Sequence, residues 1–219
     1  MRSIILAAGR GTRLNPLTLN KPKPLVEILD KSLISRQLNI LKSQGINDIN
    51  VVAGYLGKQL INNGYNVIFN NEFENTNMVY SLICAENLLD EDLIVSYGDI
   101  AYSPEILESL VKSKSDISIV VDLKWLDYWS KRFDNPLDDL ESLILNANDE
   151  IINIGEKVNS YDQIQGQFIG LMKFSTLGVK RLKDTYSYFR SNGKIMNKDI
   201  RDAYMTCLLY TSPSPRDSS

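Results

Sequence analysis

The sequence of 219 residues contains no histidine. This absence excludes every catalytic arrangement that needs an imidazole, including the Ser-His-Asp and Cys-His nucleophile pairs and the HExxH zinc site. It also removes the side chain that most often acts as a general base at neutral pH. Any chemistry must therefore depend on carboxylates, amines, guanidinium groups or a bound metal ion.

Cysteines and long hydrophobic runs are also scarce. Cys84 and Cys207 are far apart in the sequence and form neither a CxxC pair nor a zinc ligand set, which favours a reducing compartment. The apolar run near the N-terminus is too short for a signal peptide or a membrane span. A formal net charge of -3 provides no overall positive field for nucleic acid or anionic lipid. We therefore expect a cytoplasmic protein that binds neither nucleic acid nor membrane.

Short apolar runs alternate with amphipathic stretches in the first half of the chain, which indicates a single α/β domain with a parallel sheet between helices. The second half adds elements expected to supply a lobe that faces the substrate. Strands are predicted at residues 4–8, 49–53, 67–70, 93–96, 117–121, 142–145, 151–154 and 168–174. Helices are predicted from residue 32 to a stop at Gly45 and at residues 56–62, 77–89, 104–111, 177–189 and 198–205.

A glycine loop at residues 9–13 follows the first predicted strand and continues through three prolines to residue 24. The dinucleotide-binding motif GxGxxG is incomplete because Leu14 replaces its third glycine, and the prolines oppose the long helix that this motif requires. The glycines instead expose backbone N–H groups, and Arg13 and Lys23 can bind phosphate oxygens. The loop therefore predicts a polyanion site, with a solvated basic loop as the alternative.

The segment from residue 6 to residue 26, LAAGRGTRLNPLTLNKPKPLV, resembles the signature of sugar-nucleotide pyrophosphorylase-like nucleotidyltransferases. This resemblance implies a Rossmann-like, mixed and mainly parallel sheet flanked by helices. It implies that Arg13 assists the departure of pyrophosphate and that Lys23 contacts phosphate, both as catalytic residues. The loop residues that it implies around the nucleotide are Leu6, Ala8, Gly9, Gly11 and Thr12.

The segment SYGDI at residues 96–100 looks like the strand-end Gly-Asp segment of the same family. The resemblance implies that Asp99 binds magnesium (Mg2+), and a carboxylate at the end of a buried strand is where an open α/β sheet places its ligands. The alternative for Asp99 is a helix or turn cap.

The segment NNEFENTNMVYSL at residues 70–82 stands where sugar-type members carry a Gly-Thr-Ala segment that faces the base. Together with GQFIGL at residues 166–171, it is similar to the phosphocholine cytidylyltransferase branch, which includes relatives that activate aminoethylphosphonate. The resemblance predicts CTP as the donor, with Thr76, Asn77 and Ser81 at the cytosine edge. Asn77 could equally be the N-cap of the following helix.

The acceptor site is expected in the second half of the chain. Trp125 and Tyr128 lie in an aromatic segment that precedes several carboxylates, a composition that suits an ammonium group, although their helical spacing equally fits a helix packed on a core. Lys157 matches a lysine that relatives present to the acceptor phosphate, or else is an exposed turn residue. The predicted acceptor-binding residues are Trp125, Tyr128, Lys157 and Gln167.

These features predict a monomeric or homodimeric enzyme that transfers CMP from CTP to a phosphocholine-like or aminoethylphosphonate acceptor, with Mg2+ as cofactor and pyrophosphate as the leaving group. No general base is needed because the acceptor oxygen is already largely ionised at neutral pH. A sugar-1-phosphate nucleotidyltransferase that uses UTP or dTTP, and a non-catalytic nucleotide-binding module, are the alternatives.

Residues 207–219 do not resemble the family and look like a translated sequencing adapter, with a genuine Ser/Pro-rich disordered terminus as the alternative. The second metal-binding aspartate of the family has no match before Met205. We therefore expect a nucleotidyltransferase domain at residues 1–206 that is truncated at its C-terminus and poorly active. Cys84 is then the one native thiol.

Overall fold

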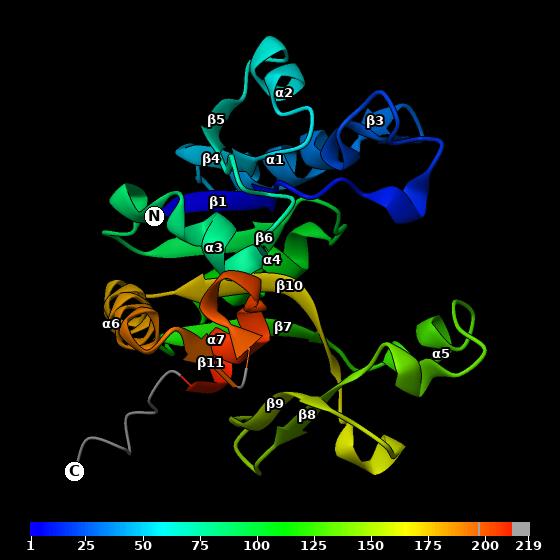
Figure 1. The fold of residues 1–219 in the computed structure, drawn as a ribbon, viewed down its shortest axis with the longest axis vertical. Coiled ribbons are helices and arrows are strands. Elements are labelled where there is room, and N and C mark those ends of the chain that lie inside the picture. The colour runs from blue at the N-terminus through cyan, green and yellow to red at the C-terminus, as the bar shows by residue number, and fades with distance from the viewer. Residues whose placement is uncertain (197, 212–219) are drawn as a thin grey trace.

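The computed structural model describes residues 1–196 and 198–211, and its central sheet has six strands in the order β5-β4-β1-β6-β10-β7 (Figure 1). The strand pairs β1–β4, β1–β6 and β4–β5 are parallel, whereas β10 pairs antiparallel with both β6 and β7. The sheet is therefore mixed and mainly parallel. The strands are β1 (Arg2–Ala7), β4 (Ile49–Ala53), β5 (Asn66–Phe69), β6 (Leu93–Tyr97), β7 (Ile117–Asp122) and β10 (Gln167–Phe174).

Helices cover both faces of the sheet, as the continuous apolar run of β1 requires. Because successive side chains of a strand point to opposite faces, Ile4 and Leu6 belong to one apolar cluster and Ile5 and Ala7 to the other. The Ile5 face packs against α1 (Leu33–Ser43), α2 (Lys58–Asn62) and α4 (Pro104–Lys112). The Ile4 face packs against α3 (Met78–Ile83), α6 (Thr176–Asn192) and α7 (Met205–Thr211).

Helix α1 shows how local sequence sets an element's ends. The Ser32 hydroxyl accepts a hydrogen bond from the Ser35 backbone N–H at 3.3 Å, which caps the first turn, and Gly45 adopts a φ of +75° just past the last turn. Both ends of the predicted helix are confirmed. In the described part of the chain, no helix is both long and apolar enough to cross a membrane.

A small lobe lies beside the main body (Figure 1). It contains α5 (Trp125–Trp129) and an antiparallel hairpin of β8 (Glu141–Leu145) and β9 (Ile151–Lys157). Trp125, Leu140, Val158 and Ile164 form its own apolar cluster. The shorter hairpins elsewhere pair β2 (Glu27–Ile28) with β3 (Lys31–Ser32) and β11 (Lys194–Ile195) with β12 (Lys198–Asp199).

The helix predicted at residues 198–205 is wrong. The chain there forms β12 and a 3-10 turn at Ile200–Asp202, and α7 begins only at Met205. The Asp199 side chain accepts from the Arg201 backbone N–H at 2.9 Å, a local bond that competes with the helix. The Arg201 carbonyl accepts from the Asn77 backbone N–H at 2.8 Å, so the segment serves the start of α3.

Helix α7 carries the folded chain through Thr211, past the boundary predicted at residue 206. Cys207 and Leu208 are 2% and 1% exposed within the Ile4 face cluster. A disordered terminus is therefore wrong for residues 207–211. Residues 212–219 lie outside the described residues, and the adapter origin predicted for residues 207–219 stays a prediction.

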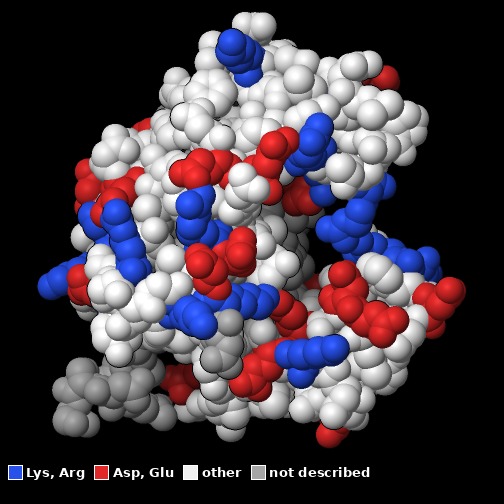
Figure 2. Space-filling view, in the orientation of Figure 1, with Lys and Arg blue, Asp and Glu red and all other residues white. Residues whose placement is uncertain are grey.

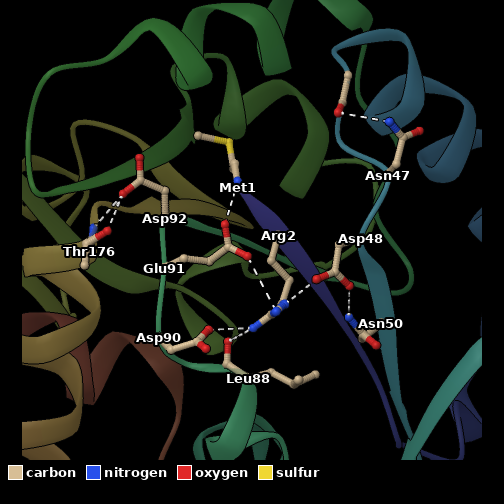
Figure 3. A network of polar contacts seen from close by, with 11 residues as sticks. Met1, Arg2, Asn47, Asp48, Asn50, Leu88, Asp90, Glu91, Asp92 and Thr176 are labelled. Carbon is tan, nitrogen blue, oxygen red and sulfur yellow. Dashed lines mark hydrogen bonds and ion pairs between the residues drawn. The ribbon is translucent and has the colours of Figure 1, made fainter.

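Arg2, the first residue of β1, ties together loops at the N-terminal edge of the sheet (Figure 3). Its Nε lies 2.6 Å from Asp48 Oδ2, and its Nη1 lies 2.6 Å from Asp90 Oδ1 and donates to the Leu88 carbonyl at 2.6 Å. The Arg2 side chain is only 15% exposed. The hydrogen bond from Arg2 lowers the pKa of the Asp48 carboxyl below its ordinary value.

Arg2→Met should lower the free energy of unfolding by about 1–3 kcal/mol at neutral pH, because charge-assisted hydrogen bonds to a largely buried guanidinium are lost. The folded-state pKa of Asp48 lies below its unfolded value of about 4, so this stabilisation is complete above that value and is lost as the pH falls through the folded-state pKa. Urea unfolding at about pH 7 and about pH 3 should show the difference from wild type shrinking at the lower pH.

Lys112→Met is the matched control, because Lys112 pairs with Glu108 at 2.5 Å but its side chain is 72% exposed. It should change the unfolding free energy by less than about 0.5 kcal/mol. An Arg2 variant that behaved like this control would contradict the role assigned to Arg2.

Candidate active site

The glycine loop after β1 has an irregular backbone with 3-10 turns at Thr12–Leu14 and Lys23–Leu25. Gly11 adopts a φ of +66°, and a Cβ added there would lie 3.0 Å from the Lys23 Cβ. Glycine is therefore needed both for the turn and for the close approach of the Lys23 stem. The buried Thr18 hydroxyl donates to the Gly11 carbonyl at 2.9 Å and fixes the loop at this residue.

A cavity of about 300 Å³ opens between this loop, the start of α3 and the carboxyl end of β6, and we call it the inner cavity. That volume lies within the range of small-molecule sites, and the place is where an open α/β sheet binds ligands. The structure brings the predicted nucleotide, catalytic and metal-binding residues together here. These lining residues are Leu6, Ala8, Gly9, Gly11, Thr12, Arg13, Lys23, Thr76, Asn77, Ser81 and Asp99.

The cations of the loop differ in how they are neutralised. Arg10 pairs with Glu74 at 3.0 Å, Lys21 lies 3.6 Å from Glu27, and Lys23 forms an ion pair with Asp99. Within residues 1–196 and 198–211, Arg13 has no carboxylate partner. Arg13 is therefore the cation of the loop that is available to an anionic ligand without breaking an existing pair.

Asp99 follows a glycine at which any side chain would collide with the sheet. A Cβ at Gly98 would lie 2.8 Å from the Ala7 Cβ, so the chain can turn here only with glycine. Asp99 consequently projects from the end of β6 into the wall of the inner cavity. The ion pair with Lys23 holds it opposite the glycine loop.

Gln37 of α1 fixes the turn that carries Asp99. It is 1% exposed, and its Nε2 donates to the carbonyls of Tyr97 and Ile100, each at 2.9 Å. Its Oε1 accepts from the Ser96 hydroxyl at 2.9 Å. One buried amide therefore holds the backbone on both sides of Asp99. The sequence analysis missed Gln37, although a polar residue on the apolar face of an amphipathic helix is a signal for such a role.

The structure confirms that Asn77 is an N-cap, whereas its contact with the cytosine edge stays a prediction. Asn77 lines the inner cavity, and its Oδ1 accepts from the Met78 backbone N–H at 2.9 Å as the N-cap of α3. Outside the cavity, the Tyr80 hydroxyl donates to Glu72 at 2.7 Å, and Arg201 forms an ion pair with the same carboxylate. The hydrogen bonds from Tyr80 and Arg201 lower the pKa of the Glu72 carboxyl, so this carboxylate is charged at neutral pH.

A second cavity of about 1100 Å³, the outer cavity, adjoins the first, and Arg13, Met78 and Tyr97 line both. The lobe, β10 and α7 supply its other walls. Figure 2 shows a hollow between the main body and the lobe, with side chains of both charges along its rim. The charged lining residues are Arg13, Asp138, Asp139, Glu141, Glu156, Lys157 and Lys198.

Two of the four predicted acceptor residues, Lys157 and Gln167, line the outer cavity. The Gln167 Nε2 donates to the Glu141 carbonyl at 2.7 Å, so this side chain also ties β10 to β8. Trp125 is 6% exposed in the lobe's apolar cluster, which supports the interpretation as a helix face packed on a core. Tyr128 is 53% exposed and packs edge-on against Trp129. Neither Trp125 nor Tyr128 lines a cavity described here, whereas Trp129 lines the outer one.

Asp99 is the side chain of the inner cavity best suited to hold a metal ion. Among the described residues, no group of three or more His, Cys, Asp or Glu side chains is placed so that it could hold a metal ion by itself. In nucleotide sites, however, Mg2+ is usually bound by one or two carboxylates together with substrate phosphates. A lone carboxylate beside a phosphate-binding loop fits that arrangement.

Comparison with known proteins places the chain among nucleotidyltransferases. Residues 3–137 match the family model of the MobA-like NTP transferase domain. The chain is 41% identical over 220 residues to the CTP:phosphoglutamine cytidylyltransferase of Campylobacter jejuni, covering 95% of this chain and 87% of that protein. It is 45% identical over 101 residues to the choline-phosphate cytidylyltransferase of Streptococcus pneumoniae, covering 44% of this chain and 42% of that protein.

Two solved structures share the fold. The CTP:phosphocholine cytidylyltransferase of Streptococcus pneumoniae matches with a TM-score of 0.69 and 22% identity, covering 95% of this chain and 83% of that chain. The inositol-1-phosphate CTP transferase from T. maritima matches with a TM-score of 0.71 and 23% identity, covering 100% of this chain and 82% of that chain. At these identities the likeness concerns the fold alone.

Gln37→Met should lower the free energy of unfolding by about 2–4 kcal/mol, because three hydrogen bonds are lost and the partner groups stay in a largely apolar interior. Gln59→Met is the matched control, since Gln59 Nε2 donates a single bond to the Asn20 carbonyl at 2.8 Å near the surface. That control should cost less than about 1 kcal/mol in the same urea titration. Equal losses for the two variants would argue against a special role of Gln37.

Proposed function

Because the chain belongs to the family of MobA-like NTP transferase domains and is a nucleotidyltransferase, we propose that it transfers CMP from CTP to a small phosphate- or phosphonate-bearing acceptor that carries a cationic nitrogen group. The observation that carries this proposal is the pair of adjoining cavities that share Arg13. A nucleotide in the inner cavity and an acceptor in the outer one would meet at this guanidinium.

The proposed reaction joins an acceptor phosphate oxygen to the α-phosphorus of CTP. The new O–P bond forms as the bond between the α-phosphorus and the bridging oxygen to the β-phosphorus breaks, and pyrophosphate leaves with that electron pair. The second pKa of a phosphate monoester is near 6, so the attacking oxygen is already largely ionised at neutral pH. No proton has to be removed, which agrees with a chain that contains no histidine.

The protein's contribution is to position the reactants and to neutralise charge. Gly9 and Gly11 line the inner cavity, so a phosphate could approach their backbone N–H groups closely, and Lys23 would add a point charge beside them. Arg13 can bind two phosphate oxygens through its planar fork. Placed between the two cavities, it would stabilise the charge that develops on the leaving pyrophosphate and hold the acceptor in line.

Asp99 would hold Mg2+ together with the nucleotide phosphates. The ion supplies further charge neutralisation to the triphosphate when it is bound. Lys23 already neutralises the Asp99 carboxylate in the structure, so a triphosphate would offer Lys23 a second anionic partner. The two residues are therefore expected to separate partly when nucleotide and metal bind.

The acceptor is best sought among phosphorylated compounds with both an ammonium and a carboxylate group. The relative that acts on phosphoglutamine is similar over 95% of this chain, whereas similarity to the choline-phosphate enzyme covers 44%. The outer cavity offers carboxylates to an ammonium group and cations to a carboxylate or phosphate, which suits a zwitterion. Phosphocholine and aminoethylphosphonate remain candidates because each joins a phosphate or phosphonate group to a cationic ammonium group.

Release of pyrophosphate should be measured with CTP, UTP, dTTP and GTP against phosphoglutamine, phosphocholine, aminoethylphosphonate and glucose-1-phosphate. We expect turnover with CTP and an acceptor that bears a cationic nitrogen group, with phosphoglutamine the best of these. Preference for UTP or dTTP with glucose-1-phosphate would replace this proposal with a sugar nucleotidyltransferase. Nucleotide binding without turnover on any acceptor would indicate a binding module.

Asp99→Asn should lower kcat at least about 100-fold, because a neutral amide binds Mg2+ poorly and leaves Lys23 without its partner. Binding of Mn2+ in the presence of CTP, followed by electron paramagnetic resonance, should weaken in parallel. Asp30→Asn is the matched control, since Asp30 is exposed on the β2–β3 turn and lines neither cavity. If Asp99→Asn kept the turnover and the Mn2+ affinity of this control, the assignment of Asp99 as a metal ligand would be wrong.

A further inference from the structure

We propose that Asn70, a buried residue that does not line the inner cavity, sets the hydrogen-bonding polarity of the base site and so makes the site select cytosine over uracil. Asn70 follows β5 and is 1% exposed. The inference rests on the proposed function in one respect, namely that the base of the nucleotide lies against Thr76 and Ser81. The inference adds that Asn70 determines whether each of these two hydroxyl groups donates a hydrogen bond to the base or accepts one from it.

The orientation of the Asn70 amide follows from its partners. Its Oδ1 accepts from the Glu72 backbone N–H at 2.9 Å. A backbone N–H can only donate, so this contact identifies the oxygen and the opposite atom is the nitrogen. The Asn70 backbone N–H donates to the Ala53 carbonyl at 2.8 Å, which fixes the residue against β4.

Both hydroxyl groups must therefore act as acceptors toward Asn70. The Asn70 Nδ2 lies 3.0 Å from Thr76 Oγ1 and 3.1 Å from Ser81 Oγ, and a primary amide has two protons to donate. Thr76 donates its own proton to the Glu72 carbonyl at 2.8 Å. A carbonyl only accepts, so Thr76 has one lone pair left and no proton for a ligand.

Ser81, in contrast to Thr76, keeps a proton that it can donate to a ligand. Its oxygen accepts from Asn70, and no acceptor for its own proton is found among the residues that the structure describes. Since Ser81 is 6% exposed and lines the inner cavity, the cavity is where that proton can be used. The base site thus offers an acceptor at Thr76 and a donor at Ser81.

This pair of groups matches one pyrimidine. The exposed edge of cytosine has an amino group that donates, followed by a ring nitrogen and a carbonyl that accept. Uracil has a carbonyl in place of the amino group and a ring N–H in place of the bare nitrogen. With uracil, a carbonyl oxygen would face the Thr76 oxygen, which puts two acceptors together, and the ring N–H would face the Ser81 hydroxyl, which puts two donors together. Only a turn of these hydroxyl groups away from their present partners would avoid both clashes.

Asn70→Asp tests the assignment with almost no change in shape. A carboxylate at position 70 still accepts from the Glu72 N–H, but an oxygen that accepts the Ser81 proton replaces the Asn70 Nδ2, which donates to Ser81. The ratio of kcat/KM for CTP to that for UTP should fall at least about tenfold, the scale of one lost hydrogen bond in a buried site. Calorimetric binding of CTP and UTP should show the same fall without any acceptor.

Asn71→Asp is the matched control, because it makes the same chemical change at the exposed neighbouring residue. Repulsion between an added carboxylate and the triphosphate would weaken CTP and UTP alike and leave their ratio unchanged. The control should therefore keep the wild-type ratio. Wild-type circular dichroism and thermal unfolding of Asn70→Asp would establish that it folds.

Two further variants decide the question if Asn70→Asp does not fold. Ser81→Ala removes the donor and should lower the CTP-to-UTP ratio. Thr76→Val removes the acceptor and should weaken CTP binding about tenfold, but not the binding of the CTP analogue that lacks the amino group, the triphosphate of the 2-pyrimidinone riboside.

The outcomes separate the inference from the proposed function. A wild-type protein that binds UTP as well as CTP would overturn the proposed donor itself. A wild-type preference for CTP that survives unchanged in folded Asn70→Asp, or in both Ser81→Ala and Thr76→Val, would overturn the role of Asn70 while leaving the proposed function in place.

Discussion

Parallel pairing of β1 with β4 and β6 is the constraint on which the site depends. The register pairs Ala7 with Ala53 and Leu6 with Tyr97, so these strands end at one level. Whatever follows each strand is therefore delivered to the same edge of the sheet: the glycine loop after β1, Asn70 after β5 and the Gly98-Asp99 turn after β6. Residues scattered over the first hundred positions meet there because parallel strands share a carboxyl edge.

Buried amides hold this edge in shape. Gln37 and Asn70 are each 1% exposed, and each places its carbonyl oxygen and both amide protons in hydrogen bonds to the protein. Leaving such a group unpaired inside the protein is costly, so each amide specifies the position of its partners closely. Gln37 fixes the turn of Asp99, and Asn70 fixes the hydroxyl groups of Thr76 and Ser81, which we propose to face the base. Neither amide lines the inner cavity, yet both organise its wall.

The lobe is stabilised separately from the central sheet. It has a small apolar cluster of its own around Trp125, and its hairpin borders the outer cavity rather than the central core. The proposed nucleotide half of the site is thus built on paired strands, and the proposed acceptor half on a smaller unit. Arg13 lines both cavities and connects the two halves. This division suits a family in which the nucleotide chemistry is shared and the acceptors differ.

Local patterns in the sequence determined the sheet, its flanking helices, the turn at Gly11 and the segments that line the inner cavity, because strand period, capping and glycine geometry act over a few residues. The helix predicted from such patterns at residues 198–205 is wrong, because the carbonyls of Arg201 and Ala203 accept from backbone N–H groups at the start of α3 instead of closing helical turns. They could not distinguish Trp125 as a core residue from Trp125 as a ligand, since both fit one helical face. Only the tertiary structure decided that Trp125 is buried, that Arg13 lies between two cavities and that Gln37 and Asn70 support them, because these properties arise from contacts between residues far apart in the chain.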